Sequence, residues 1–123
     1  MRVLVAEDDK VMSQLICATL MGAGHQAIPA FDGASTMMAA IRKPPPDVIV
    51  LDLQMPAGDG AATLTKLKAS TRTALIPVVV VSGTKDPKLR DSVRGLGAAT
   101  FIEKPIVPEE FLAVVEGYGP RKG

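Results

Sequence analysis

Side chains suited to phosphoryl chemistry stand at the ends of four short apolar runs. They are an acid pair, Glu7 and Asp8, a single acid, Asp52, a hydroxyl, Ser82, and an ammonium, Lys104. Open parallel sheets bind their ligands at the carboxyl ends of the strands, so four such ends would bring these groups to one edge. Acids, a hydroxyl and a cation on one edge predict a site for phosphoryl transfer.

The run that ends at Asp52 indicates the architecture. Residues 47–52 form a short, β-branched, almost wholly apolar segment, which is typical of a central parallel strand. Strand-like and helix-like segments alternate five times along the chain. The expected strands cover 3–6, 26–30, 47–52, 78–81 and 100–103, and the expected helices cover 12–20, 34–41, 61–67, 87–96 and a segment from 108 onward. Five βα units predict an α/β fold with one parallel sheet and helices on both faces.

Local signals set the ends of several elements. Pro29 cannot donate a ladder hydrogen bond, so the strand that contains it is expected to be an outermost strand of the sheet, with a neighbour on one side only. Asp32 and Asp86 are expected to cap the helices that follow them, and Pro108 to open the last helix.

Composition narrows the functional classes. The chain has 123 residues, 47% hydrophobic and 22% charged, which fits one globular domain. Its net charge of +1 gives no electrostatic argument for binding nucleic acid or an anionic membrane directly. The single Cys17 cannot form an internal disulfide, and no apolar run approaches ~20 residues, so we expect a cytoplasmic domain without a membrane span.

Four stretches of the sequence resemble the receiver domain of bacterial two-component response regulators, over nearly the whole chain. They are Val3-Leu4-Val5-Ala6-Glu7-Asp8-Asp9, Val50-Leu51-Asp52-Leu53-Gln54-Met55-Pro56 with Asp59-Gly60 behind it, Val81-Ser82-Gly83, and Phe101-Ile102-Glu103-Lys104-Pro105. The intervals agree with those of the family: 44 residues from Asp8 to Asp52, 30 from Asp52 to Ser82, and 22 from Ser82 to Lys104. The resemblance implies a flavodoxin-like, doubly wound (βα)5 fold with strand order 2-1-3-4-5.

The resemblance also implies a reaction. Asp52 would be the phosphoacceptor, a carboxylate nucleophile that takes a phosphoryl group from a sensor histidine kinase or a phosphotransfer protein. Mg²⁺ would be bound by Glu7, Asp8, Asp52 and the backbone carbonyl of Gln54. Close carboxylates repel one another by roughly 4 kcal/mol per pair at 4 Å in an effective dielectric near 20, and a divalent cation removes that cost.

Four more residues have roles implied by the family. Ser82 would be the switch hydroxyl, and Lys104 would pair first with Asp52 and then with the phosphoryl group. Phe101 takes the position of an aromatic side chain whose rotamer follows the switch, and Pro105 that of a cis proline. The switched surface would comprise the fourth helix, fifth strand and fifth helix, with a downstream protein or a second copy as partner. Its expected members around Phe101 are Lys88, Asp91, Ser92 and Glu110.

The acid run leaves one choice open. Counting from the strand assigns Glu7 and Asp8 to the metal, with Asp8 as the direct ligand and Glu7 acting through water. Asp9 would then cap the first helix, although direct ligation by Asp9 remains an alternative.

Other functional classes fit less well. A haloacid-dehalogenase-type phosphatase needs a second Asp two residues after its nucleophile, where this chain has Gln54. A flavodoxin-like nucleotide carrier needs a phosphate-binding loop after the first strand, where Glu7 and Asp8 would repel phosphate. We therefore expect a phosphoacceptor without enzymatic turnover. The receiver domain is expected over 1–118 with a short disordered tail over 119–123, either as a stand-alone protein or as part of a longer regulator or hybrid kinase.

Overall fold

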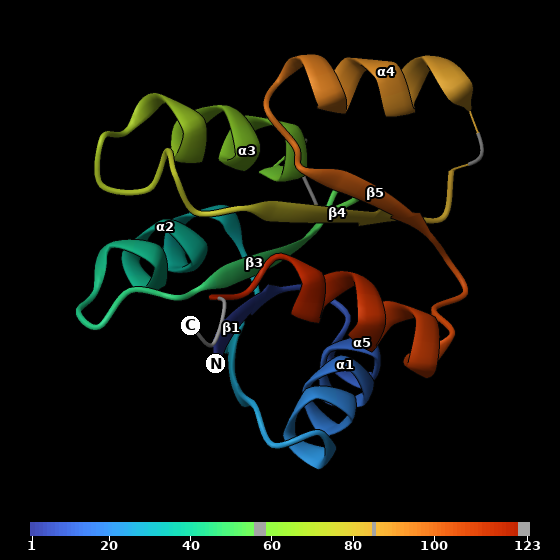
Figure 1. The fold of residues 1–123 in the computed structure, drawn as a ribbon. Coiled ribbons are helices and arrows are strands. Elements are labelled where there is room, and N and C mark those ends of the chain that lie inside the picture. Colours follow the sequence, from blue (N-terminus) through green and yellow to red (C-terminus); the bar gives the residue numbers. More distant parts are fainter. Residues whose placement is uncertain (56–58, 85, 121–123) are drawn as a thin grey trace.

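The computed structural model describes residues 1–55, 59–84 and 86–120, with the chain alternating between strand and helix (Figure 1). The strands are β1 (Arg2–Ala6), β2 (Gln26–Ala30), β3 (Val48–Asp52), β4 (Val78–Ser82) and β5 (Thr100–Glu103). The helices are α1 (Lys10–Gly22), α2 (Gly33–Ile41), α3 (Asp59–Ala69), α4 (Pro87–Gly95) and α5 (Pro108–Gly117). All strand pairs are parallel, and the order is β2-β1-β3-β4-β5, which confirms the predicted fold class.

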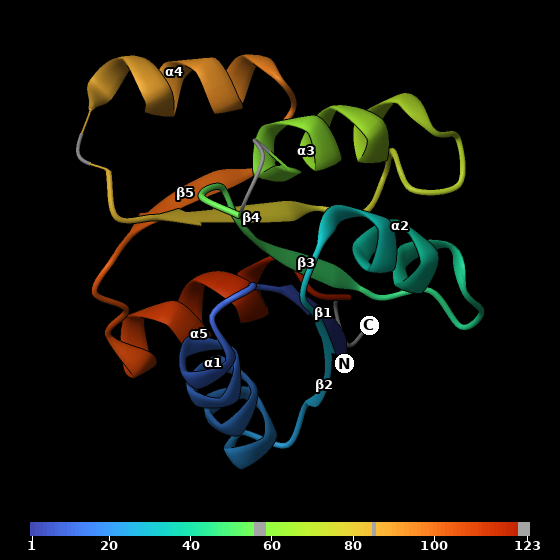
Figure 2. The same ribbon diagram turned by 180° about the vertical axis from the view of Figure 1, so that it is seen from behind.

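The helices form two layers. Figures 1 and 2 show α1 and α5 on one face of the sheet and α2, α3 and α4 on the other. Alternate residues of β1 serve the two cores: Val3 and Val5 pack with the α1–α5 layer, and Leu4 and Ala6 with the opposite layer. Strands buried on both faces must be apolar throughout, which explains the continuous apolar runs in the sequence.

The predicted helix starts are confirmed. Asp32 accepts a hydrogen bond from the Ser35 N–H at 2.7 Å, and Asp86 accepts one from the Lys88 N–H at 3.0 Å. Pro108 occupies the first turn of α5. The strand that contains Pro29 is an edge strand, where its missing N–H costs no ladder bond.

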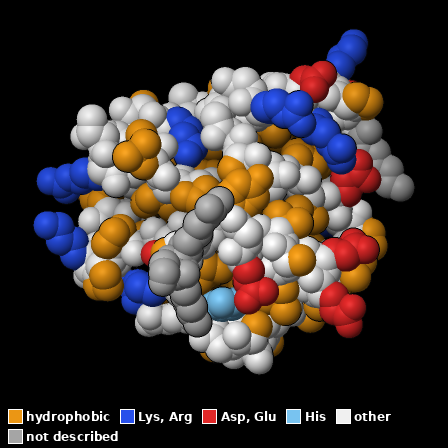
Figure 3. Space-filling model, viewed as in Figure 1, with side chains coloured by type: hydrophobic (Ala, Val, Ile, Leu, Met, Phe, Trp, Pro, Cys, Tyr) orange, Lys and Arg blue, Asp and Glu red, His pale blue; other side chains and the backbone are white. Residues whose placement is uncertain are grey.

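The last helix is tied to the beginning of the chain. His25 Nε2 lies 2.9 Å from Glu116 Oε2, and His25 Nδ1 lies 3.3 Å from the amino group of Met1. Figure 3 shows the histidine ring in pale blue beside acidic side chains on this face. The chain leaves α5 through Tyr118, and the predicted tail falls largely on 121–123, outside the described residues. Among the described residues, no helix is long and apolar enough to cross a membrane.

Gly60 permits the close approach of α3 to the end of β3. A Cβ at Gly60 would overlap the backbone of Leu53. We expect Gly60→Ala to lower the free energy of unfolding by about 1–3 kcal/mol, because backbone atoms cannot yield to a new methyl group. Chemical denaturation would measure the loss.

Gly95→Ala is the matched control, since a Cβ at Gly95 meets no atom within 4 Å. Its stability should be unchanged or slightly raised, because alanine is the better helix former. Equal stability of the two variants would contradict the packing account.

Candidate functional site at the carboxyl edge of the sheet

Parallel pairing brings the chemically active side chains to one edge. Asp52 is the last residue of β3 and pairs with Val81, and Ser82 ends β4 opposite Glu103. Glu7 and Lys104 follow directly after β1 and β5. The polar side chains that were predicted at the strand ends therefore lie at the same edge of the sheet.

Three carboxylates form the centre of this site. One carboxylate oxygen from each of Glu7, Asp8 and Asp52 lies within 4.8 Å of the others. Glu7 and Asp52 are almost fully buried, with 1% and 3% of their surface exposed, and Asp8 is half-buried. Hard oxygen ligands in such a sparse, partly open set suit Mg²⁺, which keeps several waters in its coordination shell. The donor set therefore fits a divalent cation.

Lys104 supplies positive charge to the carboxylate cluster. Its Nζ lies 3.1 Å from Glu7 Oε1 and 3.6 Å from Asp52 Oδ1. Burial by itself would lower the pKa of Lys104, but its contacts with Glu7 and Asp52 outweigh burial and raise that pKa. The ammonium is therefore shared, and its shorter contact is to Glu7 and not to the expected partner Asp52.

Glu7 has a strongly shifted pKa. Burial, together with the hydrogen bond and negative charge of Asp52, raises the pKa of Glu7 from 4.5 to about 7, against the opposing effects of Lys104 and the Asp9 N–H. Near neutral pH, Glu7 can therefore hold a proton that a metal ion would displace.

This shift predicts a pH-dependent stability in the presence of a chelator. An acid whose pKa is raised by folding stabilises the fold below its unfolded pKa, and this contribution is lost as the pH rises through the folded value. The Glu7 contribution, up to about 3 kcal/mol, should be present below pH 4.5 and lost above pH 7. Urea denaturation at several pH values would measure it, and Glu7→Gln should remove this component. Identical pH profiles for the two proteins would contradict the assignment.

Asp9 caps α1 from just outside this cluster. Its Oδ1 accepts hydrogen bonds from the N–H groups of Val11 at 2.9 Å and Met12 at 3.2 Å. Its own N–H donates to Glu7 Oε2 at 3.3 Å, so it helps to orient that carboxylate. The expected capping role of Asp9 is confirmed, and the carboxylate cluster comprises Glu7, Asp8 and Asp52.

Gln54 connects Asp52 to the loop after β4, and Ser82 is hydrogen-bonded to that loop. Ser82 is fully buried, and its Oγ accepts a hydrogen bond from the Thr84 N–H at 3.1 Å. The Gln54 N–H donates to Asp52 Oδ1 at 3.0 Å. The Gln54 side chain also reaches across to Gly83 and Thr84. Sequence reasoning missed this bridge because Thr84 lies outside the four motifs.

Phe101 lies half-buried on β5, under a cation that the sequence did not reveal. The Arg90 guanidinium lies 5.0 Å from the ring centroid and also pairs with Glu103 at 2.8 Å. A cation over an aromatic face is attracted by the ring quadrupole. Packing is therefore not the only force that holds Phe101. The peptide bond from Lys104 to Pro105 is cis.

A hollow of about 370 Å³ lies beside Phe101, between β5, α4 and α5. Glu110, an expected member of the surface around Phe101, lines this hollow together with Arg90. The other expected members, Lys88, Asp91 and Ser92, are exposed on α4 but do not line this hollow.

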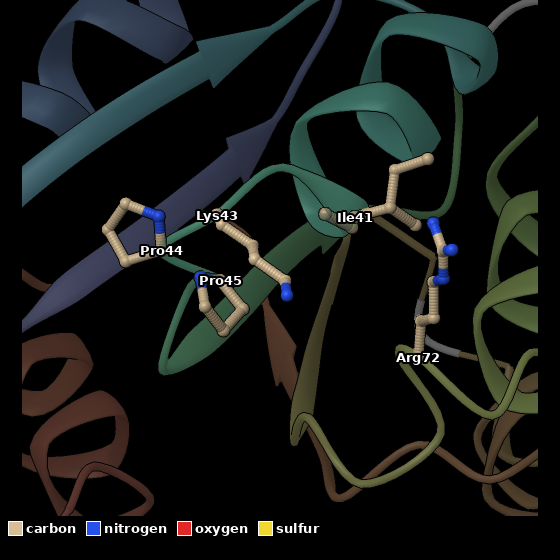
Figure 4. Close-up of a pocket in the computed structure, with 6 residues that line it drawn as sticks. Ile41, Lys43, Pro44, Pro45 and Arg72 are labelled. Atoms are coloured by element: carbon tan, nitrogen blue, oxygen red, sulfur yellow. The ribbon is translucent and has the colours of Figure 1, made fainter.

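A second hollow, of about 480 Å³, is remote from the carboxylates. Figure 4 shows Lys43, Pro44 and Pro45 on one side of it and Arg72 on the other. These residues belong to the loops that enter β3 and β4, at the opposite edge of the sheet. Among the described residues, none that lines this hollow is an acid, whereas the carboxylate cluster lies at the carboxyl ends of the strands.

Comparison with known proteins supports the geometry. A family model described as response regulator receiver domain matches residues 3–116. The chain is 35% identical over 117 residues to the phosphate regulon transcriptional regulatory protein PhoB of Escherichia coli, covering 94% of this chain and 50% of that protein. It thus spans about half the length of the curated relatives it matches.

Solved structures share the fold. The receiver domain of Francisella response regulator 1452 superposes with a TM-score of 0.85 at 29% identity, covering 95% of this chain and 94% of that one. The receiver domain of sensor histidine kinase PA1611 from Pseudomonas aeruginosa also has a TM-score of 0.85, at 21% identity and 95% coverage of both chains. That structure has a magnesium ion coordinated in its active-site cleft.

Proposed function

The chain belongs to the response regulator receiver domain family, and from this premise we propose that it stores a signal as an acyl phosphate on Asp52. The observation that carries the proposal is the convergence of three carboxylates and Lys104 at the carboxyl ends of the strands, where Glu7 and Asp52 are almost fully buried. Phosphoryl transfer needs little covalent assistance and much charge neutralisation, which such an edge supplies.

In the proposed reaction, an oxygen of Asp52 attacks the phosphorus atom of a phosphohistidine on a sensor kinase or phosphotransfer protein. The new oxygen–phosphorus bond forms as the nitrogen–phosphorus bond breaks, and the imidazole leaves with the electron pair. The hydrogen bond from the Gln54 N–H to Asp52 Oδ1 orients the carboxylate for this attack.

Glu7, Asp8, Asp52 and the backbone carbonyl of Gln54 are the proposed ligands of Mg²⁺, with Asp8 binding directly and Glu7 through water. The ion would neutralise charge on the phosphoryl oxygens and on the clustered acids. Lys104 is the second counter-charge, and its flexible stem allows its ammonium to follow the phosphoryl oxygens after transfer.

Ser82 is the proposed switch hydroxyl. Turning toward the phosphoryl group would break its hydrogen bond with the Thr84 N–H and move the loop that leads into α4. We propose that the rotamer of Phe101 follows this movement and changes the surface formed by α4, β5 and α5. Such a device shifts an equilibrium between two packings of one surface.

The hollow beside Phe101 supports this surface as the contact with a downstream protein or a second copy of the chain. The chain matches about half the length of its relatives among transcriptional regulators. This favours a receiver that controls an effector domain over a receiver that acts as a stand-alone protein. The receiver itself would not bind nucleic acid. We propose that the phosphoryl transfer takes place in the cytoplasm, where the free Cys17 thiol stays reduced.

The proposal predicts labelling by a small phosphodonor. Incubation with acetyl phosphate and Mg²⁺ should add the mass of one phosphoryl group, because the site itself neutralises the developing charge. Intact-mass spectrometry would detect the adduct. Hydroxylamine should remove it, as expected of an acyl phosphate, and a chelator should prevent its formation. No mass gain with acetyl phosphate or phosphoramidate would overturn the proposed function.

A further inference from the structure

The side chain of Gln54 joins the loop after β3 to the loop after β4. Its Oε1 accepts a hydrogen bond from the Gly83 N–H at 3.0 Å, and its Nε2 donates one to Thr84 Oγ1 at 2.9 Å. Both polar atoms of one carboxamide are thus used on two consecutive residues. We call this pair of hydrogen bonds the Gln54 strap.

The strap is linked by further hydrogen bonds to the proposed acceptor and to the proposed switch hydroxyl. On one side, the Gln54 N–H holds Asp52 Oδ1 at 3.0 Å. On the other side, the Thr84 N–H donates to Ser82 Oγ at 3.1 Å. A hydrogen-bonded path therefore runs from the acceptor Asp52, through Gln54 and Thr84, to the hydroxyl of Ser82.

We propose that Gln54 is a positioning residue that holds Gly83 and Thr84 in the resting arrangement and so opposes the switch. This inference rests on the proposed function, since it concerns the movement of Ser82 toward a phosphoryl group on Asp52. For Ser82 to turn, Thr84 must give up its bond to Ser82 Oγ, and the strap keeps Thr84 in the position that favours that bond. Gln54 thereby couples the acceptor strand to the loop that leads into α4.

The chemistry of the strap requires a carboxamide of this length. Glutamate at 54 would keep an acceptor for the Gly83 N–H but lose the donor to Thr84, and it would add a negative charge beside the carboxylate cluster. Asparagine is one methylene shorter. Alanine removes both hydrogen bonds, yet it keeps the backbone N–H and carbonyl that serve Asp52 and the proposed metal site.

The first test needs no phosphodonor. NMR can measure the rates at which the backbone amides of Gly83 and Thr84 exchange hydrogen, with a chelator present to exclude metal ions. These rates should be about fivefold higher in Gln54→Ala than in the wild type, which is the effect expected for one net hydrogen bond. Thr84→Val removes only the hydroxyl acceptor and should speed exchange at Gly83. Thr84→Ser, which keeps the hydroxyl, is the matched control and should behave as the wild type. Unchanged exchange in Gln54→Ala would overturn the strap.

The second test measures the switch itself. Beryllofluoride with Mg²⁺ imitates the acyl phosphate, and its apparent affinity rises with the population of the competent state. Gln54→Ala should bind it about fivefold more tightly than the wild type. Adding Thr84→Val to Gln54→Ala should have no further effect, because the two residues share one hydrogen bond.

The two proposals fail in different ways. A wild-type protein that does not bind beryllofluoride contradicts the proposed function, whatever the exchange rates are. If the wild type binds it and Gln54→Ala binds it no more tightly, the strap does not oppose the switch and this inference is overturned.

Discussion

Asp52→Asn should abolish labelling by acetyl phosphate while leaving the protein folded. The carboxamide is a poor nucleophile and cannot form an acyl phosphate, so intact-mass spectrometry should find no adduct where the wild type gains one phosphoryl group. The expected loss is complete, because Asp52 is the only proposed acceptor, and the other two carboxylates of the cluster are proposed to bind the metal and nothing else.

The same substitution should not destabilise the protein in the presence of a chelator above pH 7. Asp52 is one of the two causes, with burial, that raise the pKa of Glu7, so removing its charge relieves a repulsion in a buried cluster. We expect Asp52→Asn to match or exceed the wild type in free energy of unfolding. An unlabelled but stable variant would show that the substitution removes the acceptor and does not unfold the protein.

Asp91→Asn, which removes an exposed carboxylate from α4, is the control for loss of an acid, and it should still be labelled. Labelling of Asp52→Asn to the wild-type extent would remove Asp52 from the role of acceptor. Peptide mapping of the adduct would then identify the true acceptor.

Lys104→Met should produce the largest loss of stability at the site. Methionine preserves the length of the unbranched side chain but leaves Glu7 and Asp52, both almost fully buried, without the ammonium at 3.1 and 3.6 Å. Breaking a buried ion pair by removing one partner costs about 3–5 kcal/mol, because an uncompensated charge remains. We expect a loss near the lower end of that range in chelator at pH 8.

Two conditions should reduce this loss. At pH 5, Glu7 is protonated because its pKa is raised to about 7, so less negative charge is left unpaired. Addition of Mg²⁺ should also restore stability if the cluster binds the ion, since a ligand that binds only the folded state stabilises it. Urea denaturation at pH 8 in chelator, at pH 5 in chelator, and at pH 8 with Mg²⁺ would measure both effects.

Lys66→Met is the matched control, because Lys66 is exposed on α3, and its effect should stay within about 0.5 kcal/mol. A Lys104→Met protein as stable as the wild type at pH 8 would mean that the buried acids do not depend on this cation. The rate of labelling should fall as well, because the lysine neutralises charge in the transfer.

Several features of the fold could be predicted because they depend on short-range patterns. Continuous apolar runs such as 48–51 identify strands buried on both faces, and Pro29 excludes a central position for its strand. Asp32 and Asp86 act on backbone N–H groups two or three residues away, so their capping is a local matter. The helix starts followed directly.

The candidate site could be predicted in outline for a topological reason. Parallel strands with right-handed crossovers have their carboxyl ends on one edge, so polar residues that end different strands must meet there. Spacing alone therefore brought Glu7, Asp8, Asp52 and Lys104 to one edge. Spacing could not tell how the charges would be shared among them.

Only the tertiary structure shows how the Lys104 ammonium is shared between the acids and which side chains contact the site. Lys104 lies closer to Glu7 than to Asp52, Gln54 reaches Thr84, and Arg90 covers Phe101. These contacts join side chains on different loops and elements, and they depend on rotamers, burial and the lateral placement of neighbouring strands. The sequence by itself determined which groups stand at the edge of the sheet, because strand ends and crossover direction follow from local pattern. Only the packed molecule determined which of those groups touch, since a contact across strands has no periodic signature in the chain.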